Sequence, residues 1–158
     1  MEAIEPFKVP LVAQDPRPLD YLYEPDLYSY DIKLQTAIKT ASATKYQTLV
    51  TSNLKYLYWS MNQQLTHHTV TGCNLTVGDL LASGTISGPE KSEYGSLTEL
   101  TWGGRDKIQI EETGEERLFI QDGDSINMTG FCEGPDYIIG FGDCEGKVLP
   151  ALEDNNFF

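Results

Sequence analysis

Positive charge is scarce in this chain. Its 158 residues include 11 Lys and Arg against 24 Asp and Glu, so the formal net charge is −13 at pH 7. A surface of that sign repels phosphate backbones and anionic lipid headgroups. Nucleic acids and membrane surfaces are therefore excluded as expected partners.

Long apolar runs are also missing. No stretch approaches the roughly 20 apolar residues that a membrane-spanning helix needs. The first residues, Met1 to Pro6, have neither the basic region nor the apolar run of a secretory signal peptide. Cys73, Cys132 and Cys144 are odd in number and form no C-x-x-C pair, a pattern typical of reduced thiols rather than of disulfides or a zinc site. These absences predict a cytoplasmic protein.

Familiar catalytic signatures are absent as well. The sequence contains no G-x-S-x-G, no P-loop and no dinucleotide-binding fingerprint. What remains is an ordinary globular composition, with 40% hydrophobic and 22% charged residues. The length suits one domain with one hydrophobic core.

The chain divides into two parts. Residues 1–26 hold several prolines, which fix φ and cannot donate to a strand ladder, so we expect an extended arm there. Residues 27–158 then form the domain proper. The prolines of the arm are Pro6, Pro10, Pro16, Pro18 and Pro25.

One segment has a clear helical apolar pattern, with Ser52 or Asn53 available as its N-cap. Its apolar positions, three and four residues apart, are Leu54, Leu57, Met61, Leu65 and His68. This spacing predicts one main helix near residues 53–70.

The rest of the sequence favours β structure. Short apolar or alternating segments are separated by Gly-rich turns, as in sandwiches and barrel-like rolls. The expected class is therefore mainly β (α+β). The candidate strands are residues 27–34, 46–50, 79–86, 97–102, 107–111, 117–120, 125–133 and 137–141.

Two polar clusters have simple structural interpretations. One cluster is the set of four glutamates around Thr113-Gly114, namely Glu111, Glu112, Glu115 and Glu116. Clustered carboxylates can hold a hard cation. Charged side chains at a hairpin tip, however, more often only keep the turn solvated. We therefore expect no metal site at this turn.

The adjacent His67 and His68 are also poor candidates for a shared metal, because neighbouring helix positions point in different directions. His68 falls on the apolar stripe, which predicts a packed histidine.

Thr85 and Glu99 have two readings each. Thr85 follows an apolar stretch and stands among glycines in the segment 78–90, where it offers an N–H and an O–H to an anion. Spacing alone favours an ordinary strand-to-loop transition at this point. Glu99 lies in an apolar stretch, either on a wet face or buried and directed toward a histidine.

Several runs together resemble the fumarylacetoacetate hydrolase family, specifically the C-terminal portion of eukaryotic-type fumarylacetoacetases. The resemblance extends over essentially the whole chain. Its runs are Gln14-Asp15-Pro16-Arg17-Pro18-Leu19, Ser52-Asn53-Leu54-Lys55-Tyr56-Leu57-Tyr58-Trp59, Gln63-Gln64-Leu65-Thr66-His67-His68, Gly72-Cys73-Asn74-Leu75, the segment from Gly78 to Glu90, Ile139-Gly140-Phe141-Gly142 and Gly146-Lys147-Val148-Leu149-Pro150-Ala151-Leu152.

The resemblance implies a mixed β-sandwich roll, a homodimer, and hydrolysis of fumarylacetoacetate to fumarate and acetoacetate in tyrosine and phenylalanine catabolism. It implies a divalent cation, Ca²⁺ or Mg²⁺, that holds the diketone oxygens, and a histidine that activates water. By motif, Glu99 matches the glutamate that orients this histidine. Thr85 matches the threonine that binds the substrate carboxylate.

The family's catalytic histidine, its metal ligands and its pocket lysine, glutamine and tyrosines match no residue of this chain. We therefore expect a C-terminal portion of the catalytic domain that is inactive alone. One alternative is a non-catalytic dimerisation or interaction module derived from the same fold. Another is a related enzyme for a different acylpyruvate-like substrate.

Overall fold

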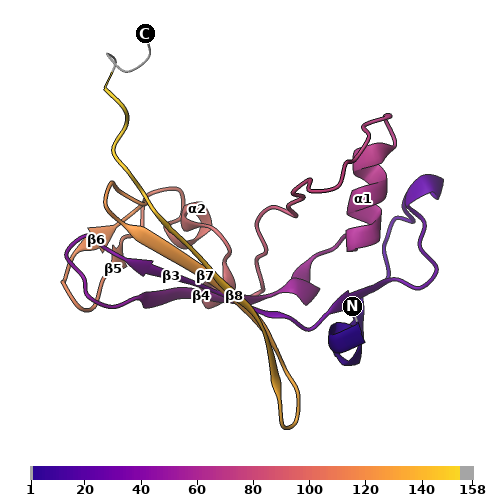
Figure 1. Ribbon diagram of the computed structural model, residues 1–158, viewed down its shortest axis with the longest axis horizontal. Helices are drawn as coiled ribbons and strands as arrows, with labels where there is room; N and C mark the ends of the chain where they lie inside the picture. Colours follow the sequence, from indigo (N-terminus) through magenta and orange to yellow (C-terminus); the bar gives the residue numbers. More distant parts are fainter. Residues whose placement is uncertain (1, 154–158) are drawn as a thin grey trace.

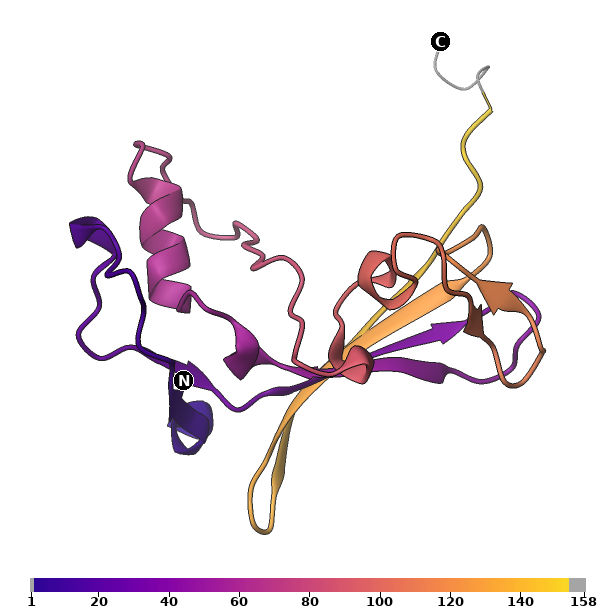
Figure 2. The same ribbon diagram turned by 180° about the vertical axis from the view of Figure 1, so that it is seen from behind.

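The computed structural model describes residues 2–153, so Met1 and residues 154–158, the outer ends of the two expected parts, lie outside it. Two limbs diverge from the middle of the molecule (Figure 1). One limb carries helix α1 (Met61–Thr69) and the N-terminal segment, and the other carries the short helix α2 (Leu97–Leu100) beside the ends of the main sheet. The view from behind shows the same open arrangement (Figure 2).

The main sheet has four strands in the order β4-β3-β7-β8. Neighbouring strands are antiparallel throughout. Its strands are β3 (Lys33–Lys39), β4 (Gln47–Asn53), β7 (Ser125–Glu133) and β8 (Ile138–Lys147). Two small antiparallel pairs accompany it: β1 (Lys8–Pro10) with β2 (Tyr28–Tyr30), and β5 (Ile108–Gln109) with β6 (Glu116–Arg117). The predicted mainly β, α+β class is confirmed.

The strand predictions are confirmed where the predicted segment pairs with a neighbouring strand of the main sheet. The segment 125–133 is β7, and the segments 46–50 and 137–141 lie at the starts of the longer strands β4 and β8. The predicted strand 27–34 is interrupted between β2 and β3. The segment 107–111 contains only the two-residue strand β5, and the segment 117–120 overlaps the two-residue strand β6 at Arg117 alone.

Two predicted strands are wrong. Residues 79–86 are irregular. Gly78, just before the segment, and Gly84, within it, take positive φ angles of 101° and 82° that a regular strand does not use. In the segment 97–102, residues Leu97–Leu100 form α2, because the hydroxyl of Ser96 accepts the backbone N–H of Glu99 and caps a helical turn. Trp102 then ends that helix with a left-handed φ of 50°.

The predicted helix near 53–70 is shorter than expected. Asn53 does cap a turn, but only the 3-10 turn η3 (Leu54–Tyr56), and Leu57 returns to extended backbone. The α-helix starts after Ser60, whose side chain and that of Gln63 form a reciprocal capping box. The second cap therefore decides where the helix begins.

Three further 3-10 turns complete the described elements. They are η1 (Glu2–Phe7), η2 (Asp20–Leu22) and η4 (Lys91–Glu93). The expected arm 1–26 thus carries two of these turns and the strand β1.

One buried apolar cluster lies where the N-terminal segment meets the sheet. Its buried members are Phe7, Tyr30, Ile32, Leu54 and Cys132. The apolar stripe of α1 is not part of it. Met61 is 62% exposed, and His68 is exposed too, so the prediction of a packed histidine is wrong. Among the described residues, no element covers that face of α1.

A buried ion pair stabilises the turn between β6 and β7. Asp124 is 0% exposed and receives two hydrogen bonds from the guanidinium of Arg117, at 2.9 and 3.0 Å. Burial alone would raise the pKa of Asp124, but the bonds from Arg117 and from the Gln121 backbone N–H outweigh it and lower that pKa. The same pair raises the pKa of Arg117.

The hairpin glutamates do more than solvate their turn, contrary to the prediction. Glu115 accepts hydrogen bonds from the hydroxyls of Thr40, Ser42 and Thr113, which lower its pKa to about 2. Glu112 accepts from Thr44 in the β3–β4 loop. Because the folded pKa of Glu115 lies below its ordinary value of 4.5, its stabilising effect is complete above pH 4.5. That effect is lost as the pH falls toward 2.

Candidate functional site

The segment that carries Thr85 is held against strand β4. The hydroxyl of Ser52 on β4 donates to the carbonyl of Ile86 at 2.9 Å. Further along, the N–H of Gly88 donates to the carbonyl of Glu93 at 3.0 Å, which closes the loop around η4. A segment without regular structure is thereby fixed in place.

Gly95 lets this segment approach the start of α2. A Cβ at position 95 would lie 2.5 Å from the carbonyl oxygen of Ile86 and 2.8 Å from Cγ2 of Thr85. Neither distance is possible for a real side chain, so residues 85–86 can pack here only against glycine. The exposed Thr85 therefore stands directly beside the turn that leads to Glu99.

Glu99 is half-buried in the first turn of α2, and two serines hold its carboxylate. Ser87 Oγ donates toward Oε1 at 2.8 Å and toward Oε2 at 3.0 Å. Ser96 Oγ donates to Oε2 at 2.6 Å. The fold thus places the segment of Thr85 beside the start of α2. Thr85 lies against Gly95, and Ser87 of the same segment donates a hydrogen bond to Glu99.

Sequence reasoning missed both serines. Ser96 could have been found, since Ser96-Leu97-Thr98-Glu99 is the S-x-x-E spacing of a capping box. Ser87 carried no such signal, because its contact with Glu99 spans twelve positions and depends on the closed loop.

An apolar groove of about 850 Å³ runs between α1 and the segment 80–84 and reaches Gly84, next to Thr85. Its lining includes Leu57, Met61, Leu65 and Leu80.

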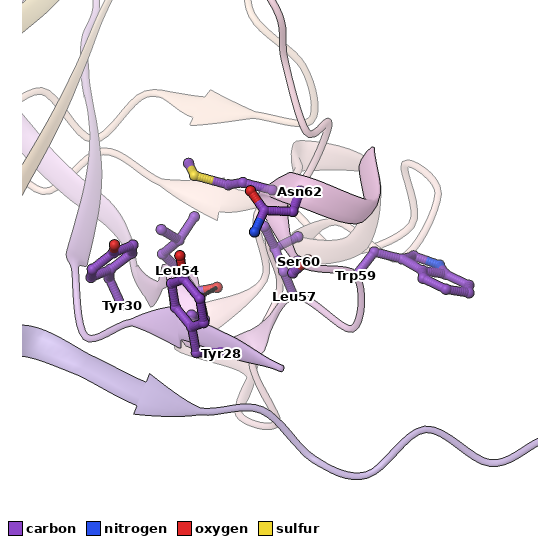
Figure 3. Close-up of a pocket in the computed structure, with 9 residues that line it drawn as sticks. Tyr28, Tyr30, Leu54, Leu57, Trp59, Ser60 and Asn62 are labelled. Atoms are coloured by element: carbon purple, nitrogen blue, oxygen red, sulfur yellow. Dashed lines mark hydrogen bonds between the residues drawn. The ribbon is translucent and has the colours of Figure 1, made fainter. Parts of the chain in front are cut away.

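A second, much smaller pocket of about 60 Å³ lies at the start of α1 (Figure 3). Tyr28, Tyr30, Ser60 and Asn62 line it together with apolar side chains. It offers no carboxylate, imidazole or thiol for acid–base chemistry.

The two histidines have separate partners. Nδ1 of His67 lies 3.1 Å from the hydroxyl of Tyr21, and Nε2 of His68 lies 3.4 Å from the thiol of Cys73. Within residues 2–153, no three His, Cys, Asp or Glu side chains gather closely enough to hold a metal ion. Nor is any helix in this part long and apolar enough to cross a membrane.

The sequence comparisons agree on one family. Residues 18–149 match the family model described as Fumarylacetoacetate (FAA) hydrolase C-terminal. The chain belongs to the fumarylacetoacetate hydrolase family.

Three relatives named fumarylacetoacetase illustrate the similarity. The chain is 53% identical to that of Homo sapiens and 52% identical to that of Dictyostelium discoideum, over 96% of its own length in each case. It is 47% identical to the rice enzyme from Oryza sativa subsp. japonica, again over 96% of its length. The same alignments cover only 36, 36 and 35% of the relatives, so this family member spans about a third of the curated proteins that it matches.

Proposed function

We propose that residues 27–158, together with the arm 1–26, form the C-terminal part of a fumarylacetoacetase catalytic domain. This part contributes Glu99 and Thr85 to the hydrolysis of fumarylacetoacetate, which yields fumarate and acetoacetate. The observation that carries the proposal is the Glu99 carboxylate, fixed by two hydroxyls beside the segment of Thr85. Family membership supplies the reaction.

Glu99 is suited to orient a histidine base. A carboxylate that accepts the N–H of an imidazole fixes its tautomer, so the other ring nitrogen can take a proton from water. Neither His67 nor His68 is available for this role, because both lie on α1 with other partners. The histidine therefore comes from a part of the enzyme outside these 158 residues.

Thr85 is suited to bind a substrate carboxylate. Its side chain is exposed, the preceding residue Gly84 lines the apolar groove, and the Thr85 hydroxyl can donate one hydrogen bond to an anion. The apolar walls leave room for the carbon skeleton of the substrate. In this arrangement Thr85 binds the substrate carboxylate, while Glu99 orients the histidine base.

A divalent cation, Ca²⁺ or Mg²⁺ in this family, would polarise the diketone oxygens. The described residues offer no cluster for it, and the hairpin carboxylates of Glu112 and Glu115 are engaged by hydroxyl groups. We therefore assign the metal ligands to other parts of the enzyme.

The proposal also includes a cytoplasmic homodimer. The net charge of −13 suits an enzyme that avoids nucleic acids and anionic membranes. The exposed apolar stripe of α1 and the groove beside it suit a subunit with further protein surface packed against it.

Exchange of the C-terminal third tests the proposed function. We expect the 158-residue chain alone to leave fumarylacetoacetate intact, because it lacks the base and the metal ligands. In place of the corresponding third of the human enzyme, which is 53% identical, it should restore hydrolysis, measured by the loss of substrate absorbance. Turnover by the chain alone would contradict this division of roles. A folded chimera without activity would contradict the function.

Thr85→Ala in that full-length context tests the binding role. Loss of one hydrogen bond to a charged group removes about 1.5 kcal/mol, so KM should rise about 10-fold while kcat stays within about twofold. Thr85→Ser keeps the hydroxyl and serves as the matched control. A fall in kcat at constant KM would show that Thr85 does not act in substrate binding.

A further inference from the structure

The Glu99 carboxylate is not held symmetrically. Each serine hydroxyl has a single hydrogen to donate. The hydrogen of Ser96 is directed to Oε2 at 2.6 Å, while that of Ser87 lies between the two oxygens, 2.8 Å from Oε1 and 3.0 Å from Oε2. Oε2 thus has two hydroxyl neighbours and Oε1 has one.

Ser87 is itself fixed in position. Its Oγ accepts the backbone N–H of Gly95 at 3.0 Å, so the oxygen has both an acceptor and a donor partner. The loop that carries Ser87 is tied to β4 through the Ser52–Ile86 hydrogen bond. The Ser87 hydroxyl therefore holds the Glu99 carboxylate at a position that is fixed relative to the sheet.

We infer that Ser87 is a positioning residue that sets the plane of the Glu99 carboxylate and leaves the second lone pair of Oε1 available to accept the imidazole N–H of the catalytic histidine. This inference rests on the proposed function. It assigns to Ser87 a role in the reaction that acts only through Glu99.

Ser87 tests this role better than Ser96 does. Ser96 also caps α2 by accepting the N–H of Glu99, so its removal would disturb the helix as well as the carboxylate. Ser87 lies outside the helix, and within residues 2–153 the hydrogen bonds of its side chain go only to the Glu99 carboxylate and the Gly95 N–H.

The experiment compares Ser87→Ala, Glu99→Gln and the double variant in the full-length enzyme that carries this chain. Ser87→Ala should lower kcat about 10-fold with KM within about twofold, since a misoriented base slows proton transfer without weakening binding. Ser87→Thr keeps the hydroxyl and should recover most of kcat. Ser92→Ala, an exposed serine on η4, is the matched control and should leave kcat unchanged.

The double variant separates a positioning role from a merely structural one. If Ser87 acts through Glu99, adding Ser87→Ala to Glu99→Gln should lower kcat by less than about twofold further. A further 10-fold loss would overturn the inference, as would an unchanged kcat in Ser87→Ala when Glu99→Gln is impaired. An unchanged kcat in Glu99→Gln itself would instead overturn the proposed role of Glu99.

Discussion

Glu99→Gln is expected to lower kcat by about 100-fold or more in the full-length enzyme, with KM changed by less than about threefold. The carboxylate accepts hydrogen bonds from Ser87 and Ser96 and, in the proposed function, from an imidazole. Glutamine has the same shape, but its NH₂ group donates where the carboxylate accepts. The amide would therefore favour the wrong histidine tautomer or displace the ring. Steady-state kinetics with fumarylacetoacetate measure the effect.

Glu111→Gln is the matched control, because the same chemical change is made at an exposed position of the β5–β6 hairpin. Its kcat should equal that of the parent enzyme. Equal losses of activity in the two variants would mean that a general change of charge is responsible. A Glu99→Gln enzyme with full kcat would show that Glu99 has only a structural role, in which it holds Ser87 and Ser96.

Asp124→Asn is expected to cause the largest loss of stability. It removes the charge of the buried partner that makes two hydrogen bonds to the Arg117 guanidinium, which is 7% exposed, and leaves only the Glu115 carboxylate, 3.6 Å away, as a charged partner. Breaking a buried ion pair from one side costs about 3–5 kcal/mol, and we expect about 3 kcal/mol because the Glu115 carboxylate remains beside the guanidinium. Nearby amide hydrogen exchange should therefore accelerate on the order of 100-fold. The informative amides are Gly123, Asp124 and Val148, which take part in the backbone hydrogen bonds of this turn.

Asp122→Asn provides the control, because Asp122 is exposed in the same turn. Exchange at the three amides should be unchanged in that variant. A second variant, Arg117→Met with Asp124→Leu, removes both charges and should recover most of the protection, since apolar replacement of a buried pair is often neutral. Unchanged exchange in Asp124→Asn would show that the ion pair contributes little to this turn.

The strand and helix predictions show which secondary structure is set by local sequence and which is set by contacts between distant residues. The strand β7 could be predicted because its apolar alternation coincides with a central place in the sheet. Residues 97–102 have an apolar pattern that suits either a strand or one helical turn, and the Ser96 cap decides for the helix. Residues 79–86 are apolar enough for a strand. Their backbone is instead governed by glycine conformations and by contacts with β4 that lie far away in the chain.

The hairpin glutamates show the same limit. Glu112 and Glu115 lie at a turn that the local sequence predicts to be exposed to solvent. Their partners, Thr44 and Thr40, precede them by 68 and 75 positions. No local pattern indicates such a contact, because it exists only once β3 and β4 have been placed beside the hairpin.

The sequence by itself determined the family, the acidic surface and the mainly β class, since these depend on composition and on contiguous runs of residues. It also indicated Thr85 and Glu99 through the family resemblance. Only the tertiary structure decided that Gly95 permits the approach of Thr85 and that Ser87 and Ser96 hold Glu99. The physical reason is that hydrogen bonds between a loop and a helix depend on distances in space, and those distances follow from the packing of the loop against the sheet.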